Sequence, residues 1–135
     1  MKRMQLAVVA ALAAVAWVPV AIAGPEKDVQ DHVTAMLRDS EDMVAHGGMG
    51  DAKAIVHHCG EVNKHAEAIL KALSPSDPHA KAAAPHLQEA IRYCQRVAEM
   101  GDKVDPGASL NPATKARAAA RDAAKHLAAI KAGGA

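Results

Sequence analysis

Residues 51–78 read DAKAIVHHCGEVNKHAEAILKALSPSDP, and this stretch decides the fold class. Its apolar positions recur every three and four residues, which is the period of one face of an α-helix. Asp51 is placed to cap the N-terminus of that helix, and Asp77-Pro78 supplies an N-cap and a first-turn proline for the next helix. We predict a helix over 51–73 with the inward residues Ile55, Cys59, Val62, Ala66, Ile69 and Leu73.

Three further segments carry the same helical signals. One covers about 26–46 and stops at Gly47-Gly48, one covers 78–100, and one runs from Asn111-Pro112 to about 131. No segment shows the alternation or the β-branched clusters of a strand. Apart from a longer connection at 101–111, the loops are short, which favours an all-α, antiparallel up-down-up-down four-helix bundle. The alternative is a three-helix core with a loosely docked, alanine-rich fourth helix.

The first 23 residues have the features of an export signal. Two basic residues precede an uncharged apolar run over 6–23, which ends in the small-residue pattern Ala21-Ile22-Ala23. Pro19 interrupts the run and no basic stop-transfer flank follows it, so a signal peptide is a better interpretation than a retained membrane anchor. We predict cleavage after Ala23 and a single mature domain over 24–135 that has no membrane association.

Charge and motifs exclude several functions. The chain has 16 basic and 15 acidic residues, and two of the basic ones lie in the predicted leader. The mature domain therefore lacks the excess of positive charge that is typical of nucleic-acid binding. Motifs for covalent haem, zinc proteases, phosphate loops and serine hydrolases are absent, and we expect no enzyme. Tyr93 is the only aromatic residue of the mature chain besides histidine, which argues against a haem pocket.

The two cysteines are predicted to face each other. In an antiparallel hairpin, residues at one level have numbers with a nearly constant sum, and Cys59 and Cys94 lie symmetrically about the turn that precedes residue 78. Both also lie near the centre of the apolar stripe of their helix. Because export leads to an oxidising compartment, we predict a Cys59–Cys94 disulfide; the alternatives are two buried free thiols or a thiolate metal pair.

The eight histidines are the most informative residues. A pattern of histidine, apolar residue, spacers and a second apolar residue occurs once on each predicted helix, beginning at His32, His65, His86 and His126. Each of these histidines lies to the same side of its helix's apolar stripe, and all four fall at about one level of the bundle. We therefore predict two histidine seams. They join either the first helix to the second and the third to the fourth, or the second to the third and the fourth to the first.

Imidazole nitrogens combined with carboxylate oxygens suit Cu(II), Zn and Ni. On the second helix His58, Glu61 and His65 share one stripe, while Asp39, Glu89 and Asp122 are optional oxygen ligands. Met36, Met43, Met49 and Met100 are candidate ligands for a soft Cu(I) site, although methionine at helical spacing usually packs in the core. The predicted metal ligands are His32, His46, His58, Glu61, His65, His86 and His126. The alternative is a helical interaction or stress protein with pH-sensitive surface histidines.

The stretch Met43-Val-Ala-His46-Gly-Gly-Met-Gly, followed by His57-His58-Cys-Gly-Glu-Val-Asn-Lys-His65-Ala-Glu-Ala-Ile, resembles the small metal-binding proteins of the bacterial periplasm. The resemblance covers about 28–131 and implies a four-helix bundle built from histidine-containing repeats. It also implies a periplasmic location and binding of several transition metals, copper prominently, for sequestration or handling. The chain departs from the family in having fewer histidines and a cysteine pair. We expect metal ions as its partners, and a monomer.

Overall fold

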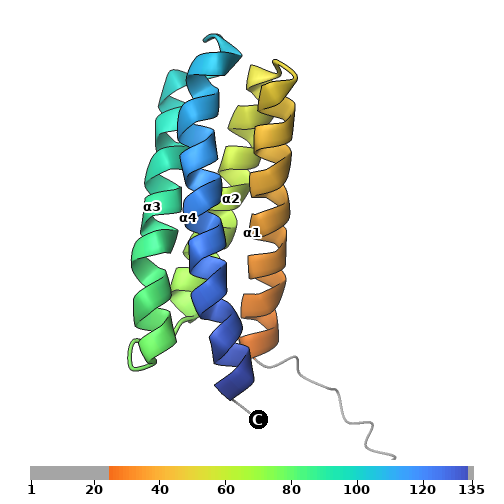
Figure 1. Ribbon diagram of the computed structural model, residues 1–135. Helices are drawn as coiled ribbons and strands as arrows, with labels where there is room; N and C mark the ends of the chain where they lie inside the picture. The colour runs from red at the N-terminus through yellow and green to blue at the C-terminus, as the bar shows by residue number, and fades with distance from the viewer. Residues whose placement is uncertain (1–24, 134–135) are drawn as a thin grey trace, which may run out of the picture.

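The structure, a computed structural model, describes residues 25–133. The predicted signal peptide and its cleavage point lie outside these residues. Within them the chain forms the helices α1 (Pro25–Gly48), α2 (Ala52–Ala72), α3 (Pro78–Met100) and α4 (Pro106–Gly133). The helices alternate in direction as an up-down-up-down bundle (Figure 1), which confirms the predicted fold class. None of the described helices is both long enough and apolar enough to cross a membrane.

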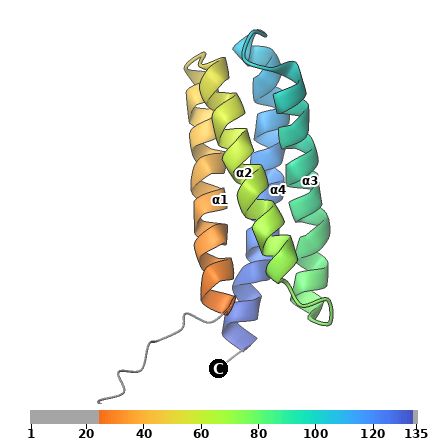
Figure 2. The ribbon, with the colours of Figure 1, turned by 180° about the vertical axis from the view of Figure 1, so that it is seen from behind.

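The helices are arranged as a ring in which each one packs against the helices before and after it. Contacts join α1 to α2, α2 to α3, α3 to α4 and α4 to α1, with a smaller contact across the diagonal between α2 and α4. Seen from behind in Figure 2, α1 lies beside α2 and α3 beside α4. The bundle therefore consists of two hairpins whose inner faces meet in the core.

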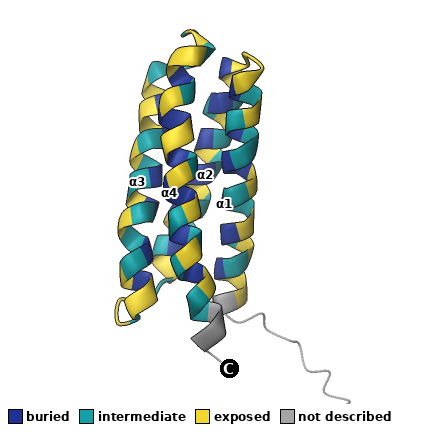
Figure 3. Ribbon diagram, in the orientation of Figure 1, coloured by how far each residue is buried: buried dark blue, intermediate teal, exposed yellow. Residues whose placement is uncertain are grey.

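The core follows the apolar stripes of the sequence, and Figure 3 shows the buried residues on the inward faces of the helices. The inward residues predicted for the second helix are buried, except that Leu73 is only partly covered. The fourth helix is not loosely docked, because its inward side chains are buried against both neighbours. These residues are Ala113, Ala116, Ala119, Ala120, Ala123 and Leu127.

The helix ends are fixed by the residues that the sequence indicated. The Asp51 side chain accepts a hydrogen bond from the backbone N–H of Ala54, and Asp77 accepts from the N–H groups of His79 and Ala80. Each cap satisfies N–H groups that have no partner inside the helix. At the other end of α3, Gly101 has a φ of 74° and its N–H bonds to the carbonyl of Val97. Glycine adopts this backbone conformation without steric cost.

The predicted start of the fourth helix was wrong. The helix begins at Pro106, and Pro112 lies inside it. Asp105-Pro106 is a helix start signal of the same kind as Asp77-Pro78, with an aspartate before a first-turn proline. The Ala108 N–H bonds to the Asp105 carbonyl at 2.9 Å. Because this earlier Asp-Pro pair starts the helix, α4 is more than a turn longer than predicted and the connection from α3 is short.

The predicted disulfide is also corrected by the structure. Cys59 and Cys94 are both fully buried and face each other, but they are free thiols. A hydrogen bond to Cys59, together with burial, raises the pKa of the Cys94 thiol. The Cys59 thiol in turn donates to the Met43 sulfur, with Sγ and Sδ 3.0 Å apart. The two cysteine sulfurs are thus buried in the core and are not covalently linked.

Candidate metal centre

The structure pairs the histidines within each hairpin. Nδ1 of His32 on α1 lies 2.9 Å from Nδ1 of His65 on α2. On the other hairpin the rings of His86 and His126 stack, with centroids 5.5 Å apart and an interplanar angle of 12°. Of the two seam arrangements that the sequence left open, the described residues therefore show the one that joins α1 to α2 and α3 to α4. The two seams lie on opposite sides of the ring of helices.

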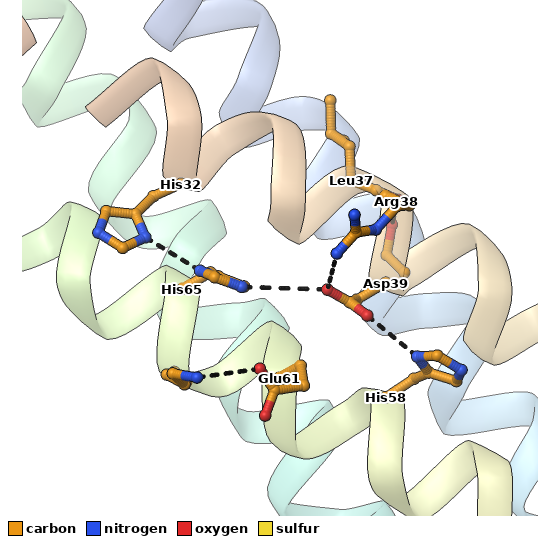
Figure 4. A network of polar contacts seen from close by, with 9 residues as sticks. His32, Leu37, Arg38, Asp39, His58, Glu61 and His65 are labelled. Atoms are coloured by element: carbon orange, nitrogen blue, oxygen red, sulfur yellow. Dashed lines mark hydrogen bonds and ion pairs between the residues drawn. The ribbon is translucent and has the colours of Figure 1, made fainter. Parts of the chain in front are cut away.

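Asp39 is the centre of the α1–α2 seam. Its Oδ1 lies 3.0 Å from Nδ1 of His58, and its Oδ2 lies 4.0 Å from Nε2 of His65 (Figure 4). Asp39 follows His32 by two helical turns, and the same spacing separates His58 from His65. Since α1 and α2 run antiparallel, these four side chains form one continuous row, from His32 through His65 and Asp39 to His58.

At the His58 end of this row, Asp42 joins Asp39 and His58 in a group of ligand atoms close enough to share one ion. One ligand atom each of Asp39, Asp42 and His58 lies within 4.8 Å of the others. His46 stacks on His58 with ring centroids 5.4 Å apart, so it brings another imidazole to the same end of the seam. Two carboxylates and one or two imidazoles form a mixed oxygen and nitrogen ligand set, which suits divalent transition metals.

The other end of the seam is a pair of imidazoles, His32 and His65. Burial lowers the pKa of His65, and the charge of His32 lowers it further, while the carboxylates of Asp39 and Glu61 act in the opposite direction. The short contact between the two Nδ1 atoms requires one ring to donate a proton and the other to accept it. At least one of the two imidazoles is therefore neutral, and a neutral imidazole is the form that ligates a metal.

The α3–α4 seam offers fewer ligands. A hydrogen bond from Lys125, at 2.6 Å, lowers the pKa of Asp122, and the charges of Lys125, His86 and His126 lower it further. This carboxylate is already engaged by a lysine, so the seam presents chiefly its two stacked imidazoles. We expect weaker binding here than on α1–α2.

The predicted ligand Glu61 lies outside these groups, as do His57 and His79, which were not among the predicted ligands. Glu61 pairs with Lys64 at 3.1 Å and turns away from the row of histidines. His57 touches the ring of His58 but is exposed, and His79 is exposed as well. The other six histidines are all half-buried at the edge of the core, as their helical positions predicted.

Sequence reasoning treated Asp39 as optional and missed Asp42. A signal was present, because Asp39 lies seven residues after His32 and Asp42 three residues after Asp39. These spacings continue the His32 stripe along the same edge of the helix.

One comparison with known proteins gives a match. The family model described as "Small metal-binding protein" matches residues 1–130, which is nearly the whole chain. No curated protein and no solved structure matches the chain. The ligand set of the α1–α2 seam fits the description of the matching family, since Asp39, Asp42 and His58 converge there.

Proposed function

Because this chain belongs to the small metal-binding protein family and is a metal-binding protein, we propose that it holds Cu(II) on the α1–α2 seam. The proposed ligands come from His32, His65, Asp39, Asp42 and His58, with His46 as a further imidazole. Copper is favoured because divalent ions at a given nitrogen and oxygen site follow an affinity order in which Cu(II) is the strongest. Zinc and nickel are expected to bind the same residues less tightly.

The observation that carries this proposal is the environment of Asp39. Only 8% of its side chain is exposed, and its nearest partners in the seam are the imidazoles of His58 and His65. Arg38, a cationic side chain that lies 3.7 Å from Asp39, is 71% exposed. A buried carboxylate is costly unless a positive charge compensates it. A divalent cation between these groups would supply that charge.

We propose metal sequestration or handling in the periplasm, the compartment to which the predicted export signal would direct the protein. The form of the site supports a role in holding the ion. Its ligands project from helices that are already packed, so little ordering is needed on binding. His58 and His65 are about 16% and 15% exposed, so an ion can reach them from the solvent. Among the described residues Met49 is the only exposed large hydrophobic side chain, and we propose that the protein acts as a monomer.

Calorimetric titration of the protein without its predicted leader tests this function. Saturable Cu(II) binding in the micromolar range or tighter is expected near pH 7.5, with sharp weakening near pH 5.5, because protons compete for imidazole below its ordinary pKa of about 6.5. Zn(II) should bind more weakly. Replacing His65 together with His32 by alanine should reduce Cu(II) binding, whereas the exposed His79→Ala should leave it unchanged.

The absence of saturable binding would overturn the proposal. So would equal binding by the double variant and by His79→Ala. Either result would favour an interaction protein whose histidines are surface groups.

A further inference from the structure

Three sulfur atoms from three different helices meet in the core. They belong to Met43 of α1, Cys59 of α2 and Cys94 of α3, and all three residues are fully buried. The Cys59 thiol donates to the Met43 thioether at 3.0 Å. Cys94 is buried beside Cys59, and this neighbour, together with burial, raises the pKa of the Cys94 thiol. The Cu(II) seam does not use these sulfurs.

We propose that Met43, Cys59 and Cys94 form a binding site for a monovalent soft metal ion, Cu(I). Thiolate and thioether sulfur are the ligand types that select Cu(I), whereas the nitrogen and oxygen ligands of the seam suit divalent ions. Within the described part of the chain, no histidine or carboxylate joins the cysteine pair within 4.8 Å. The core site is therefore made of sulfur alone.

The charge that the core tolerates also favours a monovalent ion. Binding of Cu(I) displaces the proton of one thiol to the solvent and forms a bond from copper to that thiolate. The product is a neutral buried unit, which the other cysteine and the thioether complete as ligands. Zinc sites are almost always four-coordinate, and only three sulfurs are present here. A divalent ion would therefore need a second thiolate and a fourth ligand.

The sulfur site lies directly behind the seam. Met43 is adjacent in sequence to Asp42, and Cys59 is adjacent to His58. On each helix, one of the two neighbours faces the seam and the other faces the core. The sulfur site stands independently of the Cu(II) function, because the two sites share no ligand. Met49, which is exposed, directly follows α1, and Met100 is the last residue of α3. Both thioethers are therefore at the end of the bundle nearer to the sulfur site.

The test is a competition titration with Cu(I) itself, under anaerobic conditions, on protein whose two thiols have been reduced and counted. The protein without its predicted leader is suitable, because residues 25–133 contain all four helices that the structure describes. With a coloured Cu(I) chelator as competitor, about one copper per protein should be retained, with release of about one proton and an ultraviolet thiolate-to-copper band.

Paired variants give the test its specificity. Cys59→Ala and Cys94→Ala should each abolish the band and the chelator-resistant copper. Met43→Leu conserves volume and should keep the fold. It should weaken Cu(I) affinity by at least about tenfold, which is the loss that removing even an outer hydrogen-bond partner causes at a metal site. Met36→Leu, another fully buried methionine of α1, is the matched control and should bind like the native protein. Circular dichroism checks the helix content of each variant.

Two results would overturn the proposal. One is reduced native protein that retains no Cu(I) against the chelator. The other is Met43→Leu that binds Cu(I) as tightly as Met36→Leu does. Cu(II) titration of the same variants distinguishes failure of the Cu(I) proposal from failure of the proposed Cu(II) site on the α1–α2 seam. The sulfur substitutions leave every seam ligand in place, so they should not change Cu(II) binding.

Discussion

Replacing Asp39 by asparagine should separate metal binding from folding. The carboxylate lies 3.0 Å from a nitrogen of His58 and 4.0 Å from one of His65. Two unit charges 4 Å apart interact with about 1 kcal/mol in water and with about 4 kcal/mol at an effective dielectric constant of 20. Because the site is mostly buried, Asp39→Asn should weaken Cu(II) binding by about ten- to hundredfold, which lies within that range.

The same substitution should leave the metal-free fold intact. The asparagine oxygen can still accept a hydrogen bond from His58, and the side chain keeps its shape. Removing an incompletely compensated buried charge should change the free energy of unfolding by about 1 kcal/mol or less, and in the stabilising direction. The pKa of His65 should fall further, since Asp39 is one of the groups that raise it.

Calorimetry with Cu(II), urea unfolding of the metal-free protein and an NMR titration of the histidines would measure these effects. Asp31→Asn is the matched control, because Asp31 is an exposed aspartate of α1 that pairs with Lys27. The reasoning is refuted if Asp39→Asn binds Cu(II) like the control. It is also refuted if the variant loses more than about 2 kcal/mol of stability with unchanged affinity, since Asp39 would then be a structural partner only.

Three further outcomes follow from the structure. Burial lowers the pKa of His65 in the folded protein, so as the pH falls the unfolded chain protonates this histidine before the folded protein does. Urea unfolding should therefore show that the metal-free protein loses stability below about pH 6.5, and His65→Gln should reduce this loss. Replacing His86 and His126 together by alanine should lower the calorimetric Cu(II) stoichiometry without changing the tighter binding on α1–α2. A Cβ on Gly47 would lie 2.8 Å from a leucine of α4, whereas one on Gly48 would meet nothing within 4 Å; Gly47→Ala should therefore unfold about 1–2 kcal/mol more easily than Gly48→Ala, as thermal denaturation would show.

The helices could be predicted from the sequence because their signals are local. Apolar spacing gave the inward faces, and Asp51 and Asp77-Pro78 gave two of the starts. The start of α4 could not be decided this way, since Asp105-Pro106 and Asn111-Pro112 are both valid start signals. Only packing selects between them, and in the structure the additional turn places Leu110 against Gly47 of α1.

The candidate site was less predictable because it depends on how the helices rotate against one another. The helical positions of His32 and His65 fit either pairing of the seams, and only the structure shows their contact. The level of Cys59 and Cys94 was predictable from the hairpin, but a covalent bond depends on the separation of two sulfurs, which numbering alone does not give.

Each histidine seam lies inside one hairpin, and the two hairpins are joined by other means. His32 and His65 are 33 residues apart in the chain, and the α1–α2 row is complete within residues 25–72. The hairpins meet through their apolar faces and through the ion pairs of Glu41 with Arg117 and Arg121. An ion on the seam would therefore cross-link one half of the molecule without fastening it to the other. Binding of such an ion would then depend on how α1 and α2 pack against each other, and not on ligands from α3 or α4.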